Sequence, residues 1–203
     1  MAGRVAGGLC IIPTSPTATI DHVDLWADPD TGVVLRVQIN TGGTAAELEA
    51  EFVDISFGQP DPDVVQFDAD EAGVPVRDSP TADVIDALGA FPSLAGLTAP
   101  PDQLAGLPRR GDGSGLLNTY GAGLSVVTAA QVPPGALGRS GRGIYALPSS
   151  ERPWGGEAIV LETTLFNAQL VRLGAFDVVL AGTVTVAELD RIAGDVVARG
   201  GLL

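Results

Sequence analysis

Residues that could perform catalysis are scarce in this sequence. His22 is the only histidine among the 203 residues, so a histidine-dependent triad or a histidine-based metal site would have to use it. It alternates with Asp24 and Trp26 in a predicted strand, and no partner nucleophile is signalled. We therefore interpret His22 as a strand residue that faces solvent or a hydrogen-bond partner.

The stretch DLWADPDTGVVLRVQ (24–38) begins like a calcium-binding loop, with Asp28, Asp30 and Gly32 in alternate positions. An EF-hand loop needs oxygen ligands at its first, third and fifth positions and a glutamate at its twelfth. Counted from Asp28, the fifth position is glycine and the twelfth is isoleucine. The stretch therefore predicts a hairpin turn, which Gly32 closes in a left-handed conformation, and no metal site is expected.

Acidic residues crowd one region of the chain. Paired carboxylates can perform acid–base chemistry, but they need a desolvated pocket that the sequence does not show. We interpret the cluster as a solvated acidic rim and predict no enzyme and no cofactor. Its members are Asp54, Asp61, Asp63, Asp68, Asp70 and Glu71.

Composition limits the partners. The 11 basic residues, all arginine, stand against 25 acidic ones, which gives a net charge of −14. Nucleic acid is not an expected partner, because phosphate backbones are bound by clustered basic residues. The single cysteine, Cys10, excludes an internal disulfide. No apolar run approaches the ~20 residues needed to span a bilayer, and the chain as written carries no export signal.

The expected fold class is α+β and β-dominated. Residues 1–76 predict a curved antiparallel sheet, because apolar runs and turn-formers alternate along them. In the third run, Val33, Leu35, Val37 and Ile39 share one face. The fourth run, 47–57, changes phase, because Leu48, Ala50 and Phe52 point one way and Val53, Ile55 and Phe57 the other. A β-bulge near Phe52 and Val53, or a strand buried on both faces, would reconcile them, and we infer a strongly curved sheet.

The rest of the chain is predicted to hold a linker and a second domain. Residues 77–108 are expected to be a linker with one short helix in 77–91. Residues 109–203 predict a small α+β domain, with one or two strands in 115–132 and two or three in 157–184. A helix is expected to end the chain, capped by Thr185 with Glu188 and closed at Gly200.

Several stretches together resemble a known family, the LolA-like lipoprotein-localisation and RseB (MucB)-like sigma-E regulatory envelope proteins, particularly the actinobacterial ones. RVAGGLC (4–10) is similar to a strand start of that family, and 24–38 to its hairpin. FVDISFGQPDPDVVQF (52–67) is similar to the strand that ends its curved sheet. YGAGLSVV (120–127) and VVLAGTVTVAELDRIAGDV (178–196) resemble parts of the regulatory protein's C-terminal domain.

The resemblance implies a partial LolA-like half-barrel that holds an acyl chain or a lipoprotein anchor on its concave apolar face. It also implies a C-terminal domain that contacts an anti-sigma factor or another membrane protein. The candidate ligand face is formed by Val33, Leu35, Val37 and Ile39, with Leu25 or Trp26 of the preceding strand. The alternative is a purely protein–protein regulatory module without a lipid pocket.

The matched part begins in the middle of the family's first domain. Family members start with an export signal and several further elements, so we expect this chain to lack the N-terminal half of the LolA-like domain. The full-length gene is expected to encode an extracytoplasmic protein of the cell envelope.

Overall fold

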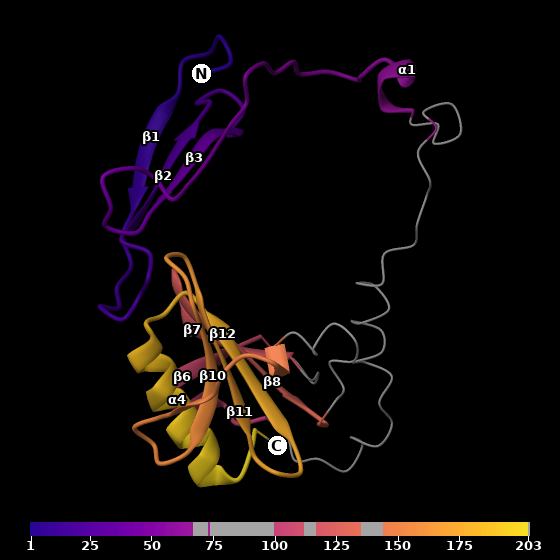
Figure 1. Cartoon of the computed structure of the whole chain (residues 1–203). Helices are drawn as coiled ribbons and strands as arrows, with labels where there is room; N and C mark the ends of the chain where they lie inside the picture. The colour runs from indigo at the N-terminus through magenta and orange to yellow at the C-terminus, as the bar shows by residue number, and fades with distance from the viewer. Residues whose placement is uncertain (67–72, 74–99, 112–116, 135–143, 203) are drawn as a thin grey trace.

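The structure is a computed structural model, and it describes residues 1–66, 73, 100–111, 117–134 and 144–202. The described residues form two separate antiparallel sheets, and Figure 1 shows the N-terminal sheet at the top and the second sheet at the bottom. The N-terminal sheet has the order β1-β2-β3-β4. Its strands are β1 (Gly7–Ile11), β2 (His22–Ala27), β3 (Val34–Asn40) and β4 (Leu48–Glu51), and a short helix, α1 (Pro62–Val65), follows them.

The second unit contains an eight-stranded sheet of order β5-β6-β7-β8-β12-β11-β10-β9, and the helix α4 (Val186–Arg199) packs against it. Its strands are β5 (Gln103–Leu104), β6 (Leu107–Arg110), β7 (Leu117–Ala122), β8 (Ser125–Val132), β9 (Ser150–Glu151), β10 (Glu157–Glu162), β11 (Asn167–Arg172) and β12 (Asp177–Gly182).

The predicted fold class is confirmed: the protein is β-dominated, with two antiparallel sheets and a C-terminal helix. The second unit, expected to be the smaller, has eight strands against four, because short strands precede and follow its predicted ones. The domain boundaries remain a prediction. The short helix expected in 77–91 lies outside the described residues.

The core of the second unit lies between α4 and the sheet. The apolar stripe of α4 supplies Leu189, Ile192 and Val196, each fully buried, and the sheet meets it with Val178 and Leu180. Burying one such aliphatic side chain contributes about 1.5–3 kcal/mol. The predicted caps of the helix are confirmed, because the Thr185 hydroxyl accepts the Glu188 N–H and Gly200 is left-handed, with φ 79°.

Backbone hydrogen bonds join the two units, between the loop that precedes β2 and the segment that links β12 to α4. The N–H of Thr19 donates to the carbonyl of Thr183 over 3.1 Å, and the N–H of Thr185 donates to that of Thr17 over 2.8 Å. The Thr19 hydroxyl also donates to the carbonyl of Leu165 over 2.6 Å. The connection between β1 and β2 thereby docks onto the one between β12 and α4, and Figure 1 shows it extending down to the second unit.

The change of phase predicted within 47–57 arises because β4 ends at Glu51, so Val53, Ile55 and Phe57 lie outside the strand. The predicted bulge near Phe52 and Val53 is therefore not needed. Pairing with β3 continues to Phe52, whose N–H donates to the carbonyl of Leu35. The register shift of this sheet lies between β2 and β3, at Trp26 and Ala27.

Candidate functional site

The register of the N-terminal sheet separates its side chains into two faces. Residues paired directly on neighbouring strands point to the same side, and successive residues alternate. One side, here called the apolar face, carries two cross-strand rows without a polar side chain. The rows are Leu9–Leu25–Val37–Ala50 and Ile11–Val23–Ile39–Leu48.

Much of the apolar face is open to solvent. Leu9 on β1 is 61% exposed and Leu48 on β4 is 43% exposed, whereas Val23 and Leu35 on the two middle strands are buried. Phe52, the residue directly after β4, is 50% exposed. Contiguous exposed apolar surface of this kind marks interaction sites in soluble proteins.

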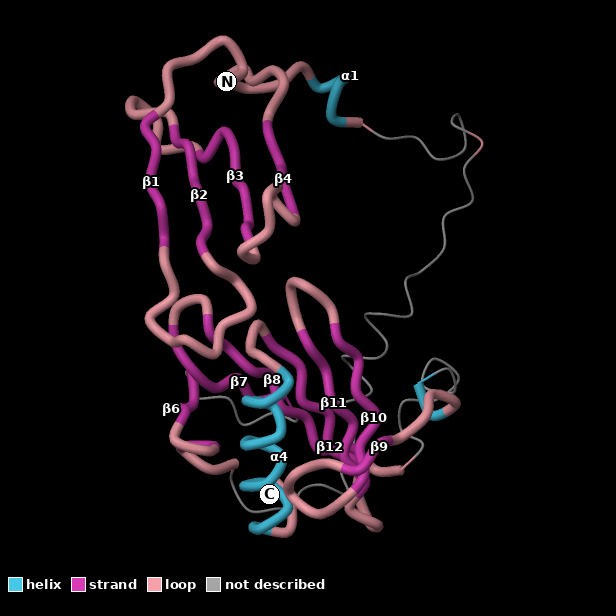
Figure 2. Tube along the Cα trace, turned by 60° about the vertical axis from the view of Figure 1, so that its left-hand side comes forward, coloured by secondary structure: helices cyan, strands magenta, loops and turns pink. Residues whose placement is uncertain are grey.

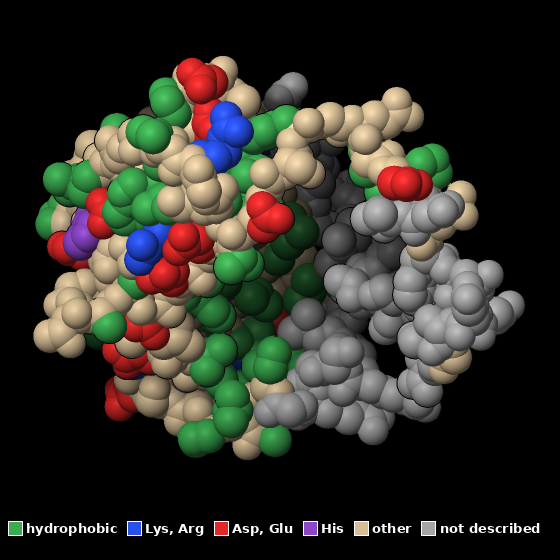
Figure 3. Space-filling model, turned by 90° about the horizontal axis from the view of Figure 1, so that it is seen from above, with side chains coloured by type: hydrophobic (Ala, Val, Ile, Leu, Met, Phe, Trp, Pro, Cys, Tyr) green, Lys and Arg blue, Asp and Glu red, His purple; other side chains and the backbone are tan. Residues whose placement is uncertain are grey.

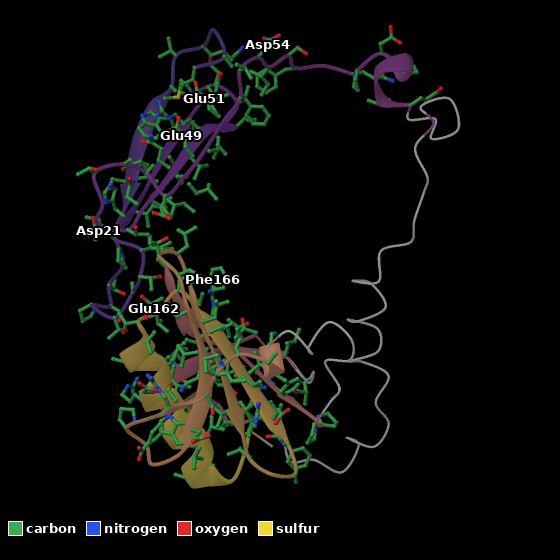
Figure 4. The ribbon with its side chains drawn as sticks, viewed as in Figure 1. Asp21, Glu49, Glu51, Asp54, Glu162 and Phe166 are labelled. Carbon is green, nitrogen blue, oxygen red and sulfur yellow. The ribbon has the colours of Figure 1, made fainter. Side chains whose placement is uncertain are left out.

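A groove of about 290 Å³ runs along the apolar face between β3 and β4. Leu35, Val37, Ala50 and Phe52 supply its apolar lining, and Glu51 lies at its border. Viewed from above, apolar side chains line the hollow that opens beside the N-terminal sheet (Figure 3). Phe166 of the second unit, 45% exposed, lies at the end of that unit nearest this sheet (Figure 4).

The opposite side, here called the polar face, is held together by contacts among its own residues. Its rows are Gly8–Trp26–Arg36–Glu51 and Cys10–Asp24–Gln38–Glu49. The Arg36 guanidinium lies over the Trp26 ring at 5.0 Å and within 3.0 Å of a Glu49 carboxylate oxygen. Hydrogen bonds from Gln38 and Arg36 lower the pKa of Glu49.

The six residues predicted to line the ligand face do not all lie on one face of the sheet. Leu25, Leu35, Val37 and Ile39 share the apolar face. Trp26, named as the alternative to Leu25, lies on the other side: it alternates with Leu25 along β2 and stacks under Arg36 on the polar face. Val33 precedes β3 and belongs to the hairpin, where its carbonyl accepts the N–H of Asp28.

Five members of the apolar face were missed from the sequence: Leu9, Ile11, Val23, Leu48 and Ala50. The alternation of GGLCI (7–11) places Leu9 and Ile11 on one side of a strand. Only the register of β1 against β2 shows that this side is the one that carries Leu25. Such pairing is not encoded locally.

The hairpin prediction is confirmed in detail. One Asp28 oxygen accepts the N–H groups of Asp30 (2.9 Å) and Thr31 (3.1 Å), and the other pairs with Arg4. These bonds, chiefly that from Arg4, lower the pKa of the almost fully buried Asp28 to about 2. Gly32 is left-handed, with φ 73°.

His22 has the hydrogen-bond partner that was predicted. Its Nδ1 lies 2.7 Å from Asp21 and its Nε2 lies 3.3 Å from Asp24. Both ring nitrogens therefore contact carboxylates on the surface of the sheet, which is a structural arrangement rather than that of a catalytic base beside a nucleophile.

Of the acidic rim, Asp54 and Asp61 are exposed, and Asp68, Asp70 and Glu71 lie outside the described residues, as does the side chain of Asp63. Among the residues that the structure describes, no three carboxylate, imidazole or thiol side chains gather as a metal site would require. In the same residues, no helix is long and apolar enough to cross a membrane.

No family model and no curated protein matches this chain. Solved structures that overlap it include "The complex structure of Pseudomonas aeruginosa MucA/MucB" and "Crystal structure of MucB in complex with MucA(peri)". The first is 19% identical with a TM-score of 0.48, and the second 20% identical with a TM-score of 0.47. Each covers 95% of this chain, whereas the chain spans only 59% and 61% of the matched chains.

Proposed function

We propose that this chain is a non-catalytic binding protein of the cell envelope, and that the apolar face of its N-terminal sheet holds an acyl chain or a lipoprotein anchor. The observation that carries the proposal is the open apolar face itself. Its two rows cross all four strands without a polar side chain, and Leu9, Leu48 and Phe52 remain 43–61% exposed.

An exposed face of this extent has a cost that ligand burial removes. Each aliphatic side chain that leaves water contributes about 1.5–3 kcal/mol when fully buried, so a hydrocarbon ligand is stabilised by burial alone. The groove between β3 and β4 gives such a ligand a place to lie along Leu35 and Val37. The sequence resemblance to envelope lipoprotein carriers supports the same ligand class.

A second candidate is a regulatory module that binds a membrane-anchored protein, such as an anti-sigma factor in sigma-E-type stress signalling, without holding lipid. The size of the groove favours this alternative. Its volume of about 290 Å³ is just below the range of ligand pockets, which span about 300–1,000 Å³.

The test introduces asparagine at two neighbouring positions of β3 whose side chains lie on opposite faces of the sheet. Val37→Asn places an amide at the centre of the apolar face, whereas Gln38→Asn leaves an amide on the polar face. Binding is followed with a fatty acid that carries an environment-sensitive fluorophore, and co-purifying lipid is identified by mass spectrometry.

We expect Val37→Asn to weaken fatty-acid binding by about 5- to 150-fold, because an amide buried without a partner costs roughly 1–3 kcal/mol. Gln38→Asn should bind as the unaltered chain does. Equal binding by all three proteins, with no lipid co-purifying, contradicts the acyl-chain proposal and leaves the regulatory module.

A further inference from the structure

The outer edge of β4 ends the N-terminal sheet, and no strand of the described residues pairs with it. Figure 2 shows β4 as the outermost strand, with open space on the side away from β3. All four of its residues are exposed. An edge of this kind carries backbone donors and acceptors that a further strand can use.

The pairing with β3 fixes which backbone groups face outward. The N–H of Phe52 donates to the carbonyl of Leu35. Because the backbone groups of an antiparallel strand point to its two sides alternately, Ala50 and Leu48 also direct theirs toward β3. Glu49 and Glu51 therefore present their N–H and C=O groups at the free edge.

The same two residues carry an excess of negative charge to that edge. A single guanidinium, that of Arg36, faces both carboxylates, at 3.0 Å from Glu49 and 3.8 Å from Glu51. Each cross-strand row of the polar face thus ends in a carboxylate at β4. Opposite charges directly across two strands stabilise their pairing.

Between the two glutamates, the edge of β4 offers a contact on the apolar face. Ala50 lies between the two glutamates and borders the groove with Leu35 and Phe52. A residue paired with Ala50 on an added strand would project to this side, next to the groove. A second copy of the chain does not fit, because antiparallel pairing of two β4 edges sets glutamates beside glutamates, and like charges repel.

We propose that the free edge of β4 binds an extended segment of a partner protein in which basic and apolar residues alternate. Cations of the segment pair with Glu49 and Glu51, and the apolar residue between them pairs with Ala50. The proposal does not depend on acyl-chain binding, since it needs the edge of the sheet and not its open face.

The test uses the full chain and a labelled heptapeptide in which arginine and valine alternate. Binding is measured by fluorescence anisotropy, and backbone amides are followed by hydrogen exchange. We compare Glu49→Gln/Glu51→Gln with Asp21→Asn/Asp24→Asn. Both double variants remove two negative charges from the same sheet, but only the first removes them from the edge.

We expect the Glu49→Gln/Glu51→Gln variant to bind on the order of tenfold more weakly, and the Asp21→Asn/Asp24→Asn variant to bind as the unaltered chain does. The amides of Glu49 and Glu51 should become protected when the peptide binds. If both double variants bind the peptide equally weakly, the effect comes from the net charge of the sheet and not from its edge, and the proposal is overturned. Failure of the peptide to bind, or protection at β1 instead of β4, would overturn it as well.

Discussion

The N–H of Thr19 donates to the carbonyl of Thr183 over 3.1 Å, in one of the two backbone hydrogen bonds described above between the N-terminal sheet and the second unit. The Thr19 hydroxyl adds a second bond to the carbonyl of Leu165. The loop between β1 and β2 therefore contacts the second unit through both its backbone and the Thr19 side chain.

Replacing Thr19 by proline should weaken the contact between the units without unfolding either sheet. Proline removes both the N–H and the hydroxyl that reach the second unit. We expect the radius of gyration from small-angle X-ray scattering to rise, while far-UV circular dichroism stays the same. Thr14→Pro is the matched control, because within the described residues the backbone of Thr14 donates no bond to the second unit. An unchanged radius for Thr19→Pro would show that other contacts hold the units.

Acid should weaken the N-terminal sheet through Asp28. The pKa of this carboxyl is about 2 in the folded protein against an ordinary value of 3.8, so the unfolded chain binds the proton more readily. Its stabilising effect is complete above about pH 4 and is lost as the pH falls toward 2. Asp28→Asn should therefore destabilise the sheet at pH 7, and its difference from the unaltered chain should shrink across that window.

Urea unfolding followed by tryptophan fluorescence checks this prediction. In a Trp154→Phe background Trp26 is the only tryptophan, and it reports on the N-terminal sheet alone. Asp30→Asn is the control, because its side chain accepts none of the bonds that hold the hairpin. A difference between Asp28→Asn and the unaltered chain that stays constant from pH 7 to 2 would contradict the role given to Asp28.

Local signals made much of this fold predictable from the sequence. The hairpin around Gly32 and the helix after Thr185 both follow from short-range preferences, for a left-handed glycine and for a hydroxyl cap. The alternation of β3 placed Leu35, Val37 and Ile39 together for the same reason.

The parts that escaped prediction depend on contacts between distant segments. The assignment of Trp26 required the register of two strands, and β6 was hidden because Pro108 argues against a strand. The docking of Thr19 on Thr183 has no local signature at all. The binding edge of β4 emerged only once its pairing with β3 was known.

Gly182 marks a close approach of two backbones in the second unit. A Cβ there would overlap the carbonyl oxygen of Val126 and lie 2.8 Å from the Cα of Val127. Gly182→Ala should therefore destabilise the sheet by about 1–3 kcal/mol, as overpacking does. The midpoint of thermal unfolding should fall by roughly 4–8 °C for each kcal/mol in a unit of this size. Gly7→Ala, whose Cβ would meet only an atom 4.0 Å away, should have little effect.

Arg152 and Asp190 form the best-buried ion pair of the second unit. Asp190 is 8% exposed, and Arg152 donates to both of its oxygens, over 2.8 and 2.5 Å. Gln169 adds a hydrogen bond of 3.1 Å, but it cannot replace the positive charge. Arg152→Met should therefore cost about 3–5 kcal/mol, because it leaves a carboxylate buried without its cation.

A double-mutant cycle separates this cost from the worth of the pair. Adding Asp190→Leu to Arg152→Met removes the stranded charge, so the double variant should recover much of the lost unfolding free energy in urea. If the loss in the double variant equals the sum of the losses in Arg152→Met and in Asp190→Leu alone, the two side chains act independently. Recovery would show that Arg152 is needed chiefly to compensate Asp190, which anchors the loop before β10 to α4.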